Sequence, residues 1–480
     1  MPGADGGALR RRPRESLKSA VMEAAPATEH AGEVRDSRGP RRRHGPGREN
    51  VSDVEGWVYC VAMPRSRPTS RPPPGPSRAV GAQIRRLTVG GFKSLHAVDV
   101  ELGQVNVFIG ANGAGKSNLL EAIGLLGAAV GGRVDDQALL RRGVRPGVPA
   151  LYKSAFKSRS VPPKISLYAH AVTGVSYHAY ITNPLFDPQP FWIFGNETIR
   201  DADESKVASR GPRGNASVGR QRLELENHGS VAALTRADRE TPAAIRDFLD
   251  GLADYAIFSP VTPVLRGIAP DTAPRAPVGL FGGQLAEAVG LMMSTQVGKQ
   301  ELAEVYDLID WADDVSIGEP SAQFVSPSVP TTRHVLRFRD RHLTRRRATL
   351  SAYDASEGAL YVLFMLILAA HHQSPRSFAI DNFDQSLNPR TARALARIFV
   401  DKVLSHERQA FLTTHNPLVL DGLPLDDDRV RLYAVERDRR SGETVVRRVT
   451  ANLARAKKSL GDAPLSRLWV MGRLGGVPNV

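Results

Sequence analysis

The sequence has little cysteine and no long apolar run, and both absences limit what this chain can be. Cys60 is the only cysteine among 480 residues, so the chain has neither an internal disulfide nor a zinc site built from cysteines. The longest nearly unbroken apolar run, Ala359 to Ala370, is too short to span a bilayer. The N-terminus carries charges but no apolar core of a secretory signal. These observations favour a cytoplasmic protein without a membrane span.

The chain is basic, with a formal net charge of +14 at pH 7. Part of this excess lies in residues 1–82, which are rich in Arg, Pro, Gly and Ser. Such a composition cannot bury enough apolar area to offset its ordering entropy, so we expect a disordered extension before a folded region that begins at Gln83. A nucleic-acid-binding tail and a true translation start at Met63 are alternatives. A basic balance permits contact with DNA but does not establish it.

The most informative stretch is a strand, a glycine-rich loop and a helix between Val105 and Val130. Residues 110–117 fit G-x-x-x-x-G-K-[ST] between an apolar run and a helical apolar pattern. Glycines let backbone N–H groups surround phosphate oxygens, and the helix N-terminus adds its positive dipole end. Lys116 would contact the outer phosphates, and Ser117 would ligate Mg²⁺. The sequence therefore predicts a nucleoside triphosphate site formed by Gly110, Asn112, Gly113, Gly115, Lys116, Ser117 and Asn118.

Motifs after residue 350 have the form of the other half of such a site. The segment Ser356–Gly358 precedes an apolar helix that should extend to about His372, although it also describes an ordinary Ser-capped helix. A predicted strand over Ser377–Asp381 ends in an acid, as in strands that hold Mg²⁺ beside phosphates. The next predicted strand, Gln409–Thr414, leads to His415, where a γ-phosphate sensor is expected.

The region between these halves predicts β structure first and helices afterwards. Residues 165–171 and 175–181 alternate like antiparallel strands of a side sheet. Residues 200–222 are polar and rich in Gly, Ser and Arg, which predicts a mobile loop. Helical patterns then return without a sustained heptad repeat, which argues against a long coiled-coil arm. These patterns cover residues 241–252, 284–297 and 300–311.

The order of these motifs resembles the ABC-class ATPases of the RecF, SMC and OLD-like group, often labelled AAA-type or AAA-21. The phosphate loop, the Ser-x-Gly signature after a long insertion, the acid-ended strand and the strand-borne His carry the resemblance. Further matching segments are residues 91–95, 117–123, 386–389 and 414–417.

The resemblance covers about residues 83–480 and implies an α/β P-loop NTPase fold. The expected form is an ABC-type ATPase head with a mixed central sheet, an antiparallel β side sheet and an inserted helical lobe. Its parts would be a phosphate-loop half (83–150), an inserted β and helical region (151–332), and a half with the signature, metal strand and His (333–480).

The resemblance also implies a homodimer assembled through ATP and Mg²⁺. Each ATP would lie between the phosphate loop of one subunit and Ser356 and Gly358 of the other. OLD-type nucleases add a C-terminal Toprim domain. The tail after His415 is too short for one, so we expect no nuclease in this chain.

One departure from the family bears on mechanism. The family usually has Asp-Glu at the metal strand, where Glu polarises the attacking water, whereas this chain has Asp381-Asn382, with Asp384 close behind. Asn orients a water but cannot accept its proton. We therefore expect an ATPase that either uses Asp384 as a substitute base or hydrolyses slowly. The sequence does not place the family's Q-loop glutamine, for which Gln137 is a candidate.

Two other functions remain open on the sequence. One is an ATP-gated switch that recruits a separately encoded effector, as in defence-type systems. The other is a DNA-repair or DNA-end-binding head.

Overall fold

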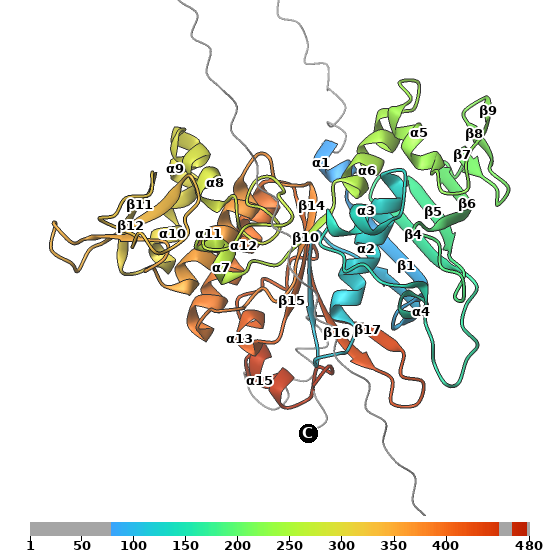
Figure 1. Cartoon of the computed structure of the whole chain (residues 1–480). Helices are drawn as coiled ribbons and strands as arrows, with labels where there is room; N and C mark the ends of the chain where they lie inside the picture. The colour runs from blue at the N-terminus through green and yellow to red at the C-terminus, as the bar shows by residue number, and fades with distance from the viewer. Residues whose placement is uncertain (1–77, 451–462, 478–480) are drawn as a thin grey trace, which may run out of the picture. The chain divides into compact units, whose positions relative to one another are not determined.

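The phosphate-loop strand lies inside a six-stranded mixed sheet in the computed structural model, which describes residues 78–450 and 463–477 (Figure 1). The strand order is β10-β14-β15-β3-β16-β17. Neighbours are parallel from β10 to β16, and β17 pairs antiparallel with β16. The expected mixed central sheet is therefore confirmed. The strands are β3 (Val105–Ile109), β10 (Ala256–Phe258), β14 (Ser377–Ile380), β15 (Gln409–Thr414), β16 (Val430–Arg437) and β17 (Thr444–Val449).

Side chains of the central sheet alternate between two hydrophobic cores. In β3, Val107 and Ile109 belong to one core and Phe108 to the other. In β15, Leu412 belongs to the core that contains Val107, and Phe411 belongs to the core that contains Phe108. A parallel sheet needs cover on both faces, which explains why these strands read as continuous apolar runs. The described residues all belong to one unit, Arg71–Val480, and most of the extension predicted over residues 1–82 lies outside them.

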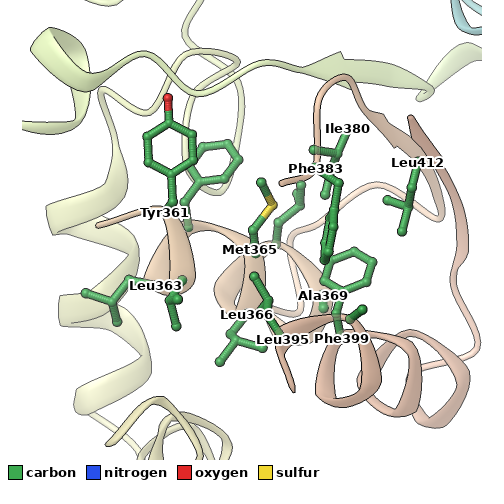
Figure 2. Packing of buried hydrophobic residues seen from close by; sticks show 14 of the residues in the cluster. Tyr361, Leu363, Met365, Leu366, Ala369, Ile380, Phe383, Leu395, Phe399 and Leu412 are labelled. Carbon is green, nitrogen blue, oxygen red and sulfur yellow. The ribbon is translucent and has the colours of Figure 1, made fainter. Parts of the chain in front are cut away.

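Two helices, α11 (Glu357–Ala370) and α12 (Pro389–Ser405), cover one face of this sheet. In Figure 2, side chains from both helices meet those of β14 and β15 in a single cluster. Every residue of α11 from Ala359 onward is buried, so the longest apolar run of the sequence is a core helix. In the described parts of the chain, no helix has the length and apolarity needed to cross a membrane.

The other face carries α2 (Lys116–Val130), α6 (Ala243–Ala253) and an antiparallel sheet of eight strands. The strand order is β2-β1-β4-β5-β6-β7-β8-β9, and Figure 1 shows β1, β4 and β5 next to one another. The predicted antiparallel side sheet is confirmed. Its strands are β1 (Ile84–Phe92), β2 (Leu95–Glu101), β4 (Ile165–Ala171), β5 (Ser176–Thr182), β6 (Ile193–Arg200), β7 (Lys206–Arg210), β8 (Asn215–Val218) and β9 (Gln221–Glu224).

The mobile loop predicted over residues 200–222 is wrong, because β7, β8 and the first half of β9 occupy this segment. β7 pairs with β6, so the sheet that precedes it supplies hydrogen-bond partners. Small side chains such as Ala208 and Ala216 are buried at alternating positions. Polar composition concealed this pattern, because β7 and β8 bury only a few side chains and β9 is exposed throughout.

Two helix boundaries in the inserted region are also wrong. The helix predicted over residues 284–297 is divided into α8 (Leu285–Met293) and α9 (Gln296–Ala303), because the Thr295 side chain accepts a 3.0 Å hydrogen bond from Gly298 N and starts a new helix. The helix predicted over 300–311 is divided between the end of α9 and α10 (Val305–Leu308). A three-stranded antiparallel sheet follows these helices, with β11 (Ala312–Gly318), β12 (Val335–Asp340) and β13 (Thr349–Ser351), and it crosses the predicted boundary at residue 332.

A buried glutamine joins the side sheet to the central sheet. The Gln409 Oε1 accepts a hydrogen bond from Ile84 N (2.9 Å), and its Nε2 donates to the carbonyl oxygens of Ile84 and Gly103 (2.8 Å each). The first strand of the fold is thus tied to the strand that leads to His415. The remaining helices are α1 (Arg78–Gly81), α3 (Asp136–Leu140), α4 (Pro149–Tyr152), α5 (Val231–Ala237), α7 (Thr262–Leu265), α13 (Pro417–Leu420) and α15 (Leu465–Val470).

Candidate functional site

Each glycine of the phosphate loop meets a different physical requirement. A Cβ on Gly110 would lie 2.1 Å from the Val435 carbonyl oxygen, so only glycine fits between β3 and β16. Gly115 has φ +110°, and a Cβ there would lie 2.2 Å from Thr444 Oγ1. Gly113 has φ +75° with open space around it. The backbone therefore needs glycine for close approach at Gly110, for conformation at Gly113, and for both at Gly115.

Hydroxyl groups from distant segments fix the loop. Thr444 Oγ1, at the start of β17, lies 2.7 Å from Ser94 Oγ and 2.8 Å from the Ala114 carbonyl oxygen. The Asn118 side-chain amide donates a 2.7 Å hydrogen bond to Ser94 Oγ. Ser94 belongs to residues 91–95, one of the segments that resemble the family in sequence. In the structure, Ser94 of this segment holds the phosphate loop through Thr444 and also accepts the hydrogen bond from Asn118.

Lys116 lies folded over the loop, next to the predicted phosphate position. Its Nζ donates hydrogen bonds to the carbonyl oxygens of Gly110 (2.8 Å) and Ala111 (3.0 Å). Burial lowers the pKa of Lys116 to about 8, and the nearby carboxylates of Asp381 and Asp384 counteract part of this effect. A buried ammonium whose hydrogen bonds go to backbone carbonyl oxygens is well prepared to bind an anion.

The two predicted metal ligands meet across the central sheet. The Ser117 hydroxyl donates a 2.8 Å hydrogen bond to Asp381 Oδ2, and Thr413 Oγ1 donates a 2.5 Å bond to Asp381 Oδ1. A hydroxyl and a carboxylate oxygen in contact are the donor set that Mg²⁺ prefers. Residues 78–450 and 463–477 contain no group of three or more His, Cys, Asp or Glu that could hold a metal. An ion between Ser117 and Asp381 would thus take its other ligands from phosphate oxygens and water.

Asn382, at the position of the family's catalytic Glu, has a left-handed backbone. Its φ is +59°, a conformation that Asn tolerates better than most residues, and its N–H donates a 2.8 Å hydrogen bond to Thr413 Oγ1. The side chain is exposed. The backbone of Asn382 is therefore fixed by β15, and its amide points away from the buried sheet.

Asp384 and His415 lie together at the end of β15. Asp384 Oδ1 accepts hydrogen bonds from Thr414 Oγ1 (2.6 Å) and His415 N (3.4 Å). Burial lowers the pKa of His415, the neighbouring Lys116 lowers it further, and the carboxylates of Asp384 and Asp381 act in the opposite direction. The ring also makes a hydrogen bond with the Gly110 backbone, which places His415 at the start of the phosphate loop. Asp381, Asp384 and Lys116 therefore all lie close to His415, and their roles in catalysis stay a prediction.

An ion-pair group beside the metal ligands was missed by the sequence interpretation. The buried Glu121 accepts hydrogen bonds from Lys93 Nζ (2.5 Å) and Arg145 Nε (2.6 Å). Arg145 and Glu121 line a cavity of about 410 Å³ together with Ser117 and Asp381. Gln137, by contrast, is exposed on α3 and does not line this cavity. Lys93 and Glu121 lie in the matching segments 91–95 and 117–123, but no local pattern reveals that they contact each other and Arg145.

The signature residues lie at a different cavity. Ser356 caps α11, since its side chain accepts a hydrogen bond from Ala359 N, and Gly358 packs against Ser386 O. Both line a cavity of about 580 Å³ at the N-terminus of α11. Among the described residues, neither lines the cavities beside the phosphate loop. A single chain therefore does not bring the signature to its own loop.

Comparison with known proteins identifies the family. The family model described as "AAA domain, putative AbiEii toxin, Type IV TA system" matches residues 105–161 and 304–421, which include Lys116, Asp381 and His415. This match and the relatives described below support an ABC-class ATPase of the RecF/SMC-like group. The expected family and the P-loop ABC-type fold class are thereby confirmed.

Curated relatives match parts of this RecF/SMC-like ATPase. The DNA replication and repair protein RecF of Clavibacter michiganensis subsp. michiganensis is 31% identical over 160 residues, or 32% of this chain and 38% of that protein. The ribose import ATP-binding protein RbsA 2 of Rubrobacter xylanophilus is 30% identical over 185 residues, or 36% of this chain and 33% of that protein. The match thus spans well under half the length of these relatives.

Solved structures of SMC heads are similar to this RecF/SMC-like ATPase at low identity. A structure of the SmcHead bound to the C-winged helix domain of ScpA gives a TM-score of 0.41 at 14% identity, covering 78% of this chain and 99% of that chain. The SMC head domain from Thermotoga maritima gives 0.34 at 13% identity, covering 77% and 100%. The fold assignment rests on the sheet topology and the family match.

Proposed function

We propose that this chain is an ATPase that binds Mg²⁺-ATP at the phosphate loop. The contact between Ser117 and Asp381 carries the proposal, because it joins the two halves of a metal–phosphate site across the sheet. Lys116 would exchange the carbonyl oxygens of Gly110 and Ala111 for the β- and γ-phosphate oxygens. Mg²⁺ would neutralise phosphate charge, held by Ser117 and Asp381.

A head-to-tail homodimer completes the proposed site. Ser356 and Gly358 line a cavity apart from their own loop, so their contribution to ATP binding requires a second copy. The helix that begins at Glu357 has its N–H groups and positive dipole end at this cavity, which suits an incoming γ-phosphate. ATP would thus control assembly, and its loss would release the two heads.

Hydrolysis is proposed to be slow. Asn382 cannot accept a proton from the attacking water, and its backbone is anchored to Thr413. Asp384 is the nearest acid that could substitute, although one of its oxygens already accepts the Thr414 hydroxyl proton. His415, with a lowered pKa, would donate its N–H to the γ-phosphate and leave the water to another group.

The presence of Asn382 in place of a catalytic Glu also favours a second candidate function. This is an ATP-gated switch that recruits a separately encoded effector. The matched family description names a toxin of a Type IV TA system, and a long-lived ATP dimer would suit such a role. A DNA-repair or DNA-end-binding head is the third candidate, and the relatives named DNA replication and repair protein RecF support it. Each of these functions would be carried out in the cytoplasm.

The experiment is analytical ultracentrifugation of the full chain with Mg²⁺-ATP, Mg²⁺-ADP or no nucleotide, together with steady-state phosphate release. We expect the chain to dimerise with Mg²⁺-ATP but not with Mg²⁺-ADP or without nucleotide, and we expect phosphate release to be slow. Absence of ATP binding would overturn the proposal. Rapid turnover with no dimer would overturn the part that concerns assembly.

A further inference from the structure

We infer that the ATP dimer is held in register by a basic surface beside the phosphate loop, which pairs with an acidic surface beside the partner's signature. This inference rests on the proposed head-to-tail dimer and names the residues that select it. The basic surface consists of Arg437, Arg439, Arg440 and Arg447 on the hairpin of β16 and β17. The acidic surface consists of Asp307 and Asp310 at the end of α10.

The basic surface lies directly against the phosphate loop. A cavity of about 610 Å³ is lined by Ala111 and Asn112 of the loop and by the four hairpin arginines. The local acids are already engaged: Glu436 pairs with Arg447 at 2.8 Å, and Asp438 Oδ1 accepts the N–H groups of Arg440 and Ser441 within the turn. The hairpin therefore presents excess positive charge at the edge of the nucleotide site.

The acidic surface lies beside the signature, as the basic surface lies beside the phosphate loop. Asp307 and Asp310 are exposed and line the 580 Å³ cavity that also contains Ser356 and Gly358. In the ranges that the structure describes, neither carboxylate has an ion-pair partner, although Arg390 borders the same cavity. Two exposed carboxylates against one arginine leave this cavity net negative.

Because the two surfaces carry opposite charges, two-fold symmetry determines which of them can face each other in the dimer. In a head-to-tail dimer, the surface around one signature faces the surface around the partner's phosphate loop, and the contact occurs twice. The acidic and basic surfaces then oppose each other at both nucleotide sites. Pairings of loop with loop or signature with signature would place like charges together. Complementary charge at an interface favours the correct partner orientation and speeds association more than it adds affinity.

The test reverses each surface separately and then both together. The acid-side variant is Asp307→Arg with Asp310→Arg, the base-side variant is Arg439→Glu with Arg440→Glu, and the combined variant carries all four changes. A matched control reverses two exposed arginines on another hairpin, Arg220→Glu with Arg222→Glu, in and beside β9. Sedimentation of the full chain with Mg²⁺-ATP measures the dimer dissociation constant, and melting temperatures verify folding.

We expect each one-sided variant to dimerise about tenfold or more weakly at 0.15 M salt, and the combined variant to recover most of this loss. The wild-type dissociation constant should rise with salt, and the hairpin control should match the wild type. Equal dimerisation of all variants would overturn the inference and leave the proposed function intact. Equal weakening in the combined variant would also overturn it. Failure of the wild type to dimerise with ATP would overturn both.

Discussion

The Ser117 hydroxyl lies 2.8 Å from Asp381 Oδ2, although 264 residues separate the two in the chain. Ser117 is the second residue of α2, and Asp381 follows β14. In the sheet, β15 lies between β14 and the loop strand β3. Parallel strands end at the same edge of a sheet, so the loop after β3 and the acid after β14 are brought together. This relationship defines the nucleotide site and gives the predictions below.

Replacement of Lys116 by Ala should weaken ATP binding by about 2 kcal/mol or more, as expected for loss of a charge-assisted contact. The variant should not lose thermal stability, because it removes a buried ammonium whose pKa is already lowered. Isothermal titration calorimetry measures the affinity and differential scanning calorimetry the stability. Unchanged ATP affinity would show that Lys116 does not contact phosphate.

ATP affinity should fall as pH rises from 7 to 9. The pKa of Lys116 is lowered to about 8 without nucleotide, and a bound triphosphate favours the protonated form. Binding at high pH must therefore take up a proton, which reduces affinity by about tenfold over this range. Titrations in two buffers of different ionisation enthalpy would reveal the uptake. A constant affinity, with equal enthalpies in both buffers, would contradict this assignment.

Gly115→Ala should damage the phosphate loop far more than Gly113→Ala. Both positions have positive φ, but only the Cβ at Gly115 meets a neighbour, Thr444 Oγ1, at 2.2 Å. We expect a loss of unfolding free energy of about 1 kcal/mol at Gly113 and about 3 kcal/mol or more at Gly115. Thermal unfolding and ATP titration of the two variants provide the measurement. Equal losses would show that the contact with Thr444 is not restrictive.

Restoring the family's carboxylate by Asn382→Glu should raise steady-state ATP hydrolysis by about tenfold or more. The gain should come with a modest loss of stability, since Glu is less tolerant than Asn of the φ of +59° at this position. Phosphate-release assays and melting curves of the variant and the wild type measure both effects.

Asp384→Asn should abolish any residual turnover if Asp384 is the substitute base. Thr414→Val is the control, because it removes the 2.6 Å hydrogen bond that Asp384 accepts and keeps the carboxylate. Brisk turnover in the wild type that is indifferent to Asn382→Glu and Asp384→Asn would mean that the base lies elsewhere.

Much of the local structure of this site could be predicted because the signals are local. The phosphate loop must have glycines at fixed positions, and the strands before Asp381 and His415 are short buried runs that end at functional side chains. Ser356 was predicted both as a signature residue and as a helix cap, and the cap is present. The role of Ser356 in a second subunit stays a prediction.

The predictions from the sequence were wrong where contacts with a distant segment of the chain determine the structure. Residues 200–222 are polar, and they form strands because β6 offers a hydrogen-bonding edge. Gln137 was the Q-loop candidate by position, yet Arg145 lines the cavity with Ser117 and Asp381. Glu121 holds Arg145 there and is itself held by Lys93, and no local pattern reports such a contact.

The sequence by itself determined the phosphate loop, the order of the acid-ended and His-ended strands, and the apolar helix α11, because glycine conformation and strand or helix periodicity are properties of short segments. Only the tertiary structure decided that Ser117 contacts Asp381, that Thr444 and Ser94 fix the loop, and that the signature lies at a separate cavity. These contacts join residues far apart in the chain, and their geometry follows from strand order and the packing of two cores around one sheet.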